Sequence, residues 1–304
     1  MTAVVEGRIP FRGHETWYRI VGEDGGLPLV LLHGGPGSTS LGSGALEPLA
    51  DERRVVRYDQ LGCGNSSQPS DPSLWTVELF VAELANLREA LRLDRIHLLG
   101  HSWGGMLALE YALTQPPGLE SLVLSSTLSS AALWEEEALR LRAGLPADVL
   151  AVLEEHEAAG TTDDPAYEEA TKEYYRRHLC RLDPWPPLVE ELFRVSRKEV
   201  YETMWGPNEM RPTGTLAGWD VTARLGEIEA PALVLCGRYD EATPRQAETI
   251  ASGLGGETEL VVLEHSAHLT LLEETERYLE LVRRFLRRVD PPKGVGTTTL
   301  VDAY

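Results

Sequence analysis

The sequence predicts an α/β fold in which a mostly parallel central sheet is interrupted by an inserted helical cap. Short apolar runs bounded by turn residues alternate with longer amphipathic segments, as strands and crossover helices alternate in a parallel sheet. Residues 29–32 (LVLL) and 233–236 (LVLC) are apolar throughout, which is typical of strands covered on both faces. The alternation stops between residues 128 and 220, where the pattern is mostly helical and no buried strand is predicted.

The expected elements follow in chain order. A hairpin-like stretch ends near residue 20, and the strands after it are expected at residues 28–33, 54–59, 96–101, 119–125, 232–240 and 259–264. The clearest helices are expected at residues 77–91, 103–113 and 271–288, the last ending before a double proline. These elements divide the chain into a core (1–127 and 221–290), a helical cap (128–220) and a tail (291–304) without an assigned role.

The charge of the chain limits its partners. Its 304 residues include 28 Lys and Arg against 48 Asp and Glu, a formal net charge of −20. Nucleic acids and anionic membrane surfaces are bound by clustered basic residues, so neither is expected as a partner. The sequence has no stretch of 18 apolar residues and no signal-peptide pattern, and neither a membrane span nor secretion is expected.

The three cysteines point to a reducing compartment. Cys63, Cys180 and Cys236 are far apart, odd in number and without a C-x-x-C pair. Neither a disulfide framework nor a zinc site is therefore predicted. We expect a cytoplasmic protein.

Residues 100–104 (GHSWG) predict a nucleophilic serine. This G-x-S-x-G pentapeptide lies where a predicted strand ends and a helix begins. Glycines on both sides of Ser102 leave room for a tight, strained turn that exposes the hydroxyl. At the helix N-terminus the partial positive charge favours a developing oxyanion.

A serine hydroxyl needs a base and an orienting carboxylate, here expected in the order serine, acid, histidine. Asp240 follows an apolar run at the expected edge of the sheet, where open α/β sheets place their sites. Two histidines come after it, and we favour His268 over His265, which directly abuts the preceding strand. The pair could also be read as H-x-x-H metal ligands, but no third ligand cluster accompanies it.

Two backbone amides are expected to form an oxyanion hole. One belongs to Trp103, the residue after the nucleophile. The other is expected in residues 33–37 (HGGPG), which leave an early strand and whose glycines let backbone approach the substrate. We expect Gly35 to be this second donor.

Several motifs together resemble the proline iminopeptidase family of α/β-hydrolases, which are serine aminopeptidases. The motifs are HGGPG, DQLGCGNS (59–66), GHSWGG, GRYDEATP (237–244) and the late histidine. The resemblance covers about residues 14–288 and implies an α/β-hydrolase fold. It assigns the catalytic triad to Ser102, Asp240 and His268, and the oxyanion hole to Gly35 and Trp103.

The resemblance also gives a role to two further carboxylates. Residues 205–209 (WGPNE) resemble the cap motif that holds the free amino group of the substrate, which assigns Glu209 to this role. Glu241, directly after the triad aspartate, matches the second such residue. An ammonium group in a partly dehydrated pocket needs paired charge, which two carboxylates supply.

The implied activity is release of the N-terminal residue, preferably proline, from short peptides, amides or arylamides through an acyl-enzyme. No metal or other cofactor is implied, and the oligomeric state is left open. A carboxylesterase or amino acid amidase using the same triad is the alternative, and a receptor that keeps the hydrolase fold is a third hypothesis. Many bacterial members have DQRG where residues 59–62 are DQLG, so the strictness of the proline preference also stays open.

Overall fold

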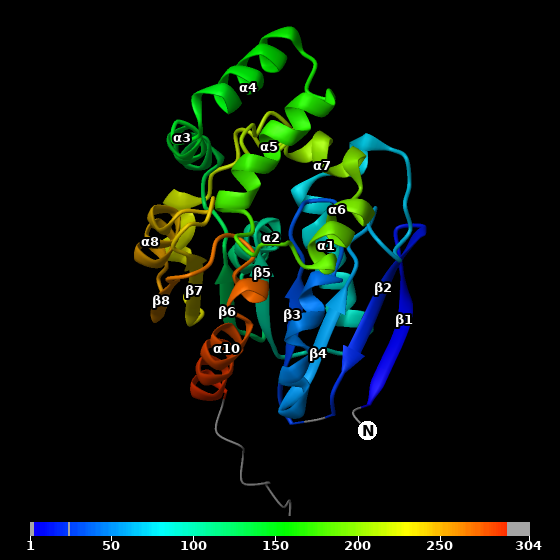
Figure 1. The fold of residues 1–304 in the computed structure, drawn as a ribbon. Coiled ribbons are helices and arrows are strands. Elements are labelled where there is room, and N and C mark those ends of the chain that lie inside the picture. Colours follow the sequence, from blue (N-terminus) through cyan, green and yellow to red (C-terminus); the bar gives the residue numbers. More distant parts are fainter. Residues whose placement is uncertain (1–2, 24, 291–304) are drawn as a thin grey trace, which may run out of the picture.

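The computed structural model describes residues 3–23 and 25–290. Its centre is one eight-stranded sheet with the strand order β1-β2-β4-β3-β5-β6-β7-β8 (Figure 1). The first two strands pair antiparallel and β3 to β8 run parallel, which confirms the predicted mostly parallel sheet. The strands are β1 (Val4–Phe11), β2 (His14–Val21), β3 (Gly26–Leu32), β4 (Arg53–Tyr58), β5 (Ile96–His101), β6 (Leu119–Ser125), β7 (Ala232–Gly237) and β8 (Thr258–Leu263).

Helices cover both faces of this sheet. The core helices are α1 (Val77–Ala90), α2 (Trp103–Leu113), α8 (Pro244–Gly253), α9 (Thr270–Glu273) and α10 (Thr275–Val289), with 3₁₀ helices η1 (Gly42–Asp51), η2 (Pro72–Leu74) and η3 (Thr222–Glu227). Val30 and Leu32 of β3 pack in the hydrophobic cluster that includes α1, α2 and α8, whereas Leu29 and Leu31 pack in the cluster with η1 and α10. Successive residues of a strand face opposite sides, so a strand between two layers must be apolar throughout.

The predicted strand at 232–240 is wrong at its end. Strand β7 stops at Gly237, and Asp240 lies in the turn that follows. The Asp240 amide donates to the Gly237 carbonyl at 3.4 Å, and the Asp240 carboxylate accepts from the Gly237 amide at 3.3 Å. These two bonds close the turn and bring the aspartate to the carboxyl edge of the sheet.

The single helix predicted at 271–288 is also wrong, because the structure forms two helices, α9 and α10. Glu274 separates them with φ −129° and ψ 51°. Its carboxylate accepts from the His265 amide at 3.0 Å. This bond anchors the helix junction to the loop that follows β8.

Between β6 and β7 the chain forms five helices above the carboxyl edge of the sheet (Figure 1). They are α3 (Ala131–Arg142), α4 (Ala147–Ala159), α5 (Pro165–His178), α6 (Pro187–Val195) and α7 (Lys198–Met204). A small hydrophobic cluster of their own includes Leu153, Tyr167 and Tyr174. A bridge between Ser130 and Asp220 joins the two ends of this insertion.

The predicted tail at residues 291–304 lies outside the described residues. Within the described part of the chain, no helix combines the length and the hydrophobicity that crossing a membrane requires.

Candidate active site

Ser102 sits at a strained turn between β5 and α2. Its φ of 55° and ψ of −125° lie in a region that residues with a side chain rarely adopt. A Cβ on Gly100 would overlap the Gly104 carbonyl, and a Cβ on Gly104 would overlap the Leu32 carbonyl. The two glycines of the pentapeptide therefore make the turn possible, and Ser102 is held at the N-terminus of α2.

His268 and Asp240 form a buried hydrogen-bonded pair. His268 Nδ1 lies 2.8 Å from Asp240 Oδ1, which also accepts from the Ala242 amide at 2.7 Å. Burial opposes protonation of the ring, but the charges of Asp240 and Glu209 outweigh it and raise the pKa of His268. With its Nδ1 hydrogen directed at Asp240, the neutral ring keeps Nε2 free to accept a proton.

The two late histidines have different surroundings. The His268 ring packs 4.8 Å from the ring of His101 and 6.2 Å from that of Trp134, in centroid distances. His265 is exposed at the surface. Among residues 3–23 and 25–290, no group of three or more His, Cys, Asp or Glu side chains is arranged to hold a metal ion.

The two predicted oxyanion donors belong to the loop after β3 and to the start of α2. Gly35 follows β3 with φ +116°, a conformation that favours glycine. The loop packs closely on the nucleophile, since a Cβ on Gly34 would lie 3.0 Å from that of Ser102. Trp103 is the first residue of α2 and is buried.

Glu241 is a fully buried carboxylate without a hydrogen-bond partner for either oxygen among the described residues. Its Oε1 lies 4.0 Å from His268 Nδ1. Burial, followed by the charges of Glu209 and Asp240, raises its pKa well above the ordinary value. Such a group is costly unless a cation or a proton compensates its charge.

Glu209 lies close to Glu241 and to the triad. Burial raises the pKa of Glu209, and the charge of His268 and the Tyr201 hydroxyl partly offset this effect. Trp134 Nε1 donates to the Glu209 carbonyl at 2.7 Å. The structure therefore brings both predicted amine-binding glutamates beside His268.

Three tyrosines surround the two glutamates. Burial, followed by the negative charges of Glu209 and Glu241, raises the pKa of Tyr174, Tyr175 and Tyr201 well above its ordinary value. Tyr175 and Tyr201 also line the cavity that contains Ser102.

A cavity of about 1410 Å³ opens between the sheet edge and the helices of residues 131–204. Its walls include Gly35, Ser102, Glu209, Tyr201 and His268. Other parts of the wall come from α5, α6 and α7. The cavity is large enough for a substrate that extends several residues beyond Ser102.

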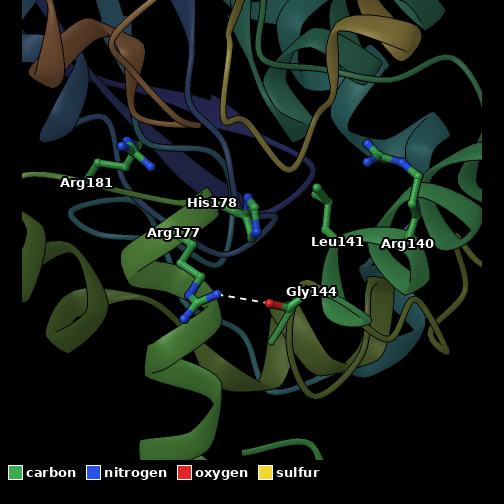
Figure 2. A pocket seen from close by; sticks show the side chains of 6 residues that line it. All are labelled: Arg140, Leu141, Gly144, Arg177, His178 and Arg181. Atoms are coloured by element: carbon green, nitrogen blue, oxygen red, sulfur yellow. Dashed lines mark hydrogen bonds between the residues drawn. The ribbon is translucent and has the colours of Figure 1, made fainter. Parts of the chain in front are cut away.

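A second, smaller pocket of about 420 Å³ lies beside α3 and α5 (Figure 2). It is lined by Arg140, Leu141, Gly144, Arg177, His178 and Arg181. Arg177 donates to the Gly144 carbonyl at 3.1 Å, and two of the three arginines are paired with glutamates of α3 and α5. The His178 carbonyl accepts from the amides of Glu241 and His268, each at 3.2 Å, and so connects the pocket wall to the loops of the larger site.

Comparison with known proteins agrees with this arrangement. The model of the alpha/beta hydrolase fold family matches residues 28–275. The proline iminopeptidase of Lactobacillus crispatus is 44% identical over 94% of this chain and 99% of its own, and that of Heyndrickxia coagulans is 41% identical over 93% and 99%. The crystal structure of the Mycobacterium smegmatis proline iminopeptidase is 41% identical, with a TM-score of 0.87 over 94% of this chain and 99% of that one. The chain therefore belongs to the α/β-hydrolases and, within them, to the proline iminopeptidase family.

Proposed function

We propose that this protein is a serine aminopeptidase that releases the N-terminal residue, preferably proline, from short peptides, amides or arylamides. The observation that carries the proposal is the buried carboxylate of Glu241, which has no hydrogen-bond partner within residues 3–23 and 25–290 and has Glu209 close by. A substrate ammonium group would supply the charge that these carboxylates lack. An esterase for uncharged substrates has no use for such a pair.

Acylation uses the residues next to this ammonium site. With the amine held by Glu209 and Glu241, the first carbonyl of the substrate lies against Ser102. The Ser102 hydroxyl attacks this carbonyl while His268 Nε2 accepts its proton, and Asp240 stabilises the imidazolium that forms. The amides of Gly35 and Trp103 donate to the tetrahedral oxyanion.

The acyl-enzyme then forms and is hydrolysed. His268 delivers its proton to the leaving amine, the C–N bond breaks and the first residue stays bound to Ser102 as an ester. Water, deprotonated by His268, attacks this ester. The bond between the acyl carbon and the Ser102 oxygen breaks, His268 returns the proton to that oxygen, and the free amino acid is released. The cavity of about 1410 Å³ leaves room for the departing peptide on the other side of Ser102.

Substitution of the two glutamates tests the proposal. Glu209→Gln and Glu241→Gln should each lower kcat/KM for a prolyl arylamide at least 30-fold, because the charge pairing with the ammonium is lost. Hydrolysis of p-nitrophenyl acetate, which has no amine, is the matched control and should change less than threefold. Prolyl arylamide cleavage at the wild-type rate in both variants would contradict the amine-binding role and favour the esterase alternative.

Labelling separates an enzyme from a receptor with the same fold. Ser102 should react with a fluorophosphonate probe in the folded protein, and Ser102→Ala should abolish the labelling. A folded wild-type protein that fails to react would contradict the hydrolase proposal. We also place the protein in the cytoplasm, since Cys63, Cys180 and Cys236 are all buried and unpaired.

A further inference from the structure

Residues 59–66 (DQLGCGNS) contribute no catalytic group to the proposed mechanism. They nevertheless contact Trp103 and, through His33, the loop that carries Gly35. Gln60 is the central residue of this contact and is fully buried. The Gln60 side chain forms hydrogen bonds with His33 and Trp103. These two residues flank the serine turn, one in the loop after β3 and the other at the start of α2.

The Gln60 amide group joins the two elements directly. Its Nε2 donates to the His33 carbonyl at 3.1 Å, and its Oε1 accepts from Trp103 Nε1 at 2.8 Å. An indole N–H only donates and a carbonyl only accepts, so the orientation of the glutamine amide is determined. Each end of the side chain therefore holds one element in place.

A third bond of Gln60 determines the tautomer of His33. The Gln60 backbone N–H donates to His33 Nε2 at 3.0 Å. Burial lowers the pKa of His33, which favours the neutral ring. Because Nε2 accepts the hydrogen bond from Gln60, the one hydrogen of the ring is on Nδ1. Nδ1 lies 2.9 Å from the Gly34 carbonyl and therefore donates to it.

This last bond reaches the catalytic amide. The carbonyl of Gly34 and the N–H of Gly35 belong to the same planar peptide unit. A hydrogen bond that holds the carbonyl also sets the direction in which the Gly35 N–H points. Since Gly35 has φ +116° and great conformational freedom, this orientation needs support from outside the loop.

The segment that carries Gln60 is itself anchored. The Asp59 carboxylate accepts from the Ser40 amide and hydroxyl and from the Asn65 amide, all at 2.8 Å. The carboxylate of Glu83 in α1 accepts from the Leu61 amide at 3.0 Å. The residues before and after Gln60 are therefore both anchored by hydrogen bonds, which fixes the position of its backbone.

We propose that Gln60 is a positioning residue that aligns both amide donors of the oxyanion hole, the Gly35 N–H through His33 and the Trp103 N–H through the indole. The inference rests on the proposed function, in which these amides stabilise the oxyanion. This role predicts an effect on the stability of the transition state and not on substrate binding. Loss of Gln60 lowers kcat and leaves binding of the ground-state substrate largely unchanged.

The first test replaces Gln60 by a residue of similar length without hydrogen bonds. Gln60→Met should lower kcat about 10- to 100-fold with a change in KM below threefold, since misplaced donors cost a factor of this order. The factor should be the same for a prolyl arylamide and for p-nitrophenyl acetate. The affinity of a prolyl aldehyde, which forms an oxyanion on Ser102, should fall in parallel, whereas that of L-prolinol, which has no carbonyl group, should not. A kcat within twofold of wild type in the folded variant would overturn the proposal.

A matched pair of tryptophans keeps the test valid if Gln60→Met is unstable. Trp103 and Trp75 are both buried and pack on Phe80, at ring distances of 5.6 and 6.5 Å, but the Trp75 indole N–H has no partner among the described residues. Trp103→Phe should lower kcat about tenfold at unchanged KM. Trp75→Phe should cost similar stability and keep kcat within twofold. Equal kcat values in the two variants would contradict the positioning role.

The two proposals fail in different ways. If wild-type protein hydrolyses p-nitrophenyl acetate but no aminoacyl arylamide, the aminopeptidase proposal is wrong and the ester still tests Gln60. If wild-type protein cleaves the prolyl arylamide and Gln60→Met does so at the same kcat, only the positioning role is wrong.

Discussion

Neither oxygen of Glu241 has a hydrogen-bond partner in the described part of the chain, so the protonation of this carboxyl should change when the substrate binds. Burial, followed by the charges of Glu209 and Asp240, raises its pKa well above the ordinary value and so favours the protonated carboxyl. An ammonium ligand favours the ionised form, and its binding should release up to one proton. The free site and the occupied site therefore differ in protonation.

Calorimetry can measure this proton. Titration of L-prolinol, which has the amine but no bond that the enzyme can hydrolyse, near pH 7 in two buffers with different ionisation enthalpies should give different apparent binding enthalpies, corresponding to release of up to one proton. Glu241→Gln should remove most of the buffer dependence. Identical enthalpies in both buffers for the wild-type protein would show that Glu241 is already ionised.

His268 should set the acid limb of the pH profile. Burial lowers its pKa, but the charges of Asp240 and Glu209 outweigh this effect, so its pKa is raised above the ordinary value. The enzyme needs the neutral ring, and kcat/KM should rise with pH through a midpoint above about 6.5. In Glu209→Gln the midpoint should move to lower pH, because one stabilising charge is removed. An acid limb that does not move would contradict this electrostatic contact.

The sequence indicated the residues that are proposed to carry the chemistry but not those that support them. Ser102 has a local motif, and the order of the chain led to Asp240 and His268. Gln60 has no comparable signal, because its partners lie 27 and 43 positions away and meet it only in the folded sheet. Tyr201 reaches Glu209 through the packing of the cap helices, which has no local sequence signal.

At the scale of elements, the end of α10 is anchored to the edge of the sheet opposite the proposed site. Asp290 binds Arg53 of β4 at 2.9 Å and His97 of β5 at 2.9 Å. Arg53 is only 2% exposed, so it depends on this partner. Burial raises the pKa of Asp290, but its bonds to His97 and Arg53 outweigh this effect and lower it to about 2.

Removal of this anchor should destabilise the fold. Asp290→Asn should lower the free energy of unfolding at pH 7 by about 2–3 kcal/mol, somewhat less than for a fully buried pair because Asp290 is partly exposed. The lowered pKa stabilises the native state above the ordinary value near 4, and this contribution is lost as the pH falls towards 2. Denaturant unfolding at pH 7 and pH 3 should therefore show a smaller difference between the variant and wild type at pH 3. A difference that is equal at both pH values would contradict the assignment.

Element boundaries were less predictable than element types. The apolar runs indicated β5 and β6 correctly because each is bounded by polar or turn residues. The ends of β7 and the last helix depend on side-chain bonds made by Asp240 and Glu274 to backbone groups. Periodicity carries no information about such bonds.

At the scale of the whole molecule, the negative charge is unevenly distributed. Residues 128–220 contain 19 acidic and 10 basic side chains, a net charge of −9 out of −20 for the chain. Most of these residues belong to α3 to α7, the helices above the carboxyl edge of the sheet (Figure 1). The sequence predicted a helical insertion here, but the way its helices enclose a cavity depends on tertiary packing.

An acidic entrance should attract cationic substrates at low ionic strength. Raising NaCl from about 20 to 500 mM should lower kcat/KM for a lysine-containing prolyl peptide several-fold, because salt screens the attraction. A prolyl peptide with a glutamate in place of the lysine is the matched control and should respond less or in the opposite direction. If both peptides respond equally, the charge serves solubility and does not steer substrates.

Selection of a free amino terminus by the carboxylates of Glu209 and Glu241 is the main feature of the proposed mechanism. Its most direct measurement compares kcat/KM for L-prolyl arylamide with that for N-acetyl-L-prolyl arylamide, which differ only in the charge and size of the N-terminal group. We predict a preference of at least 100-fold for the free amine, since a buried charge pair is worth about 2–5 kcal/mol. Equal values of kcat/KM for the two compounds would contradict this selection.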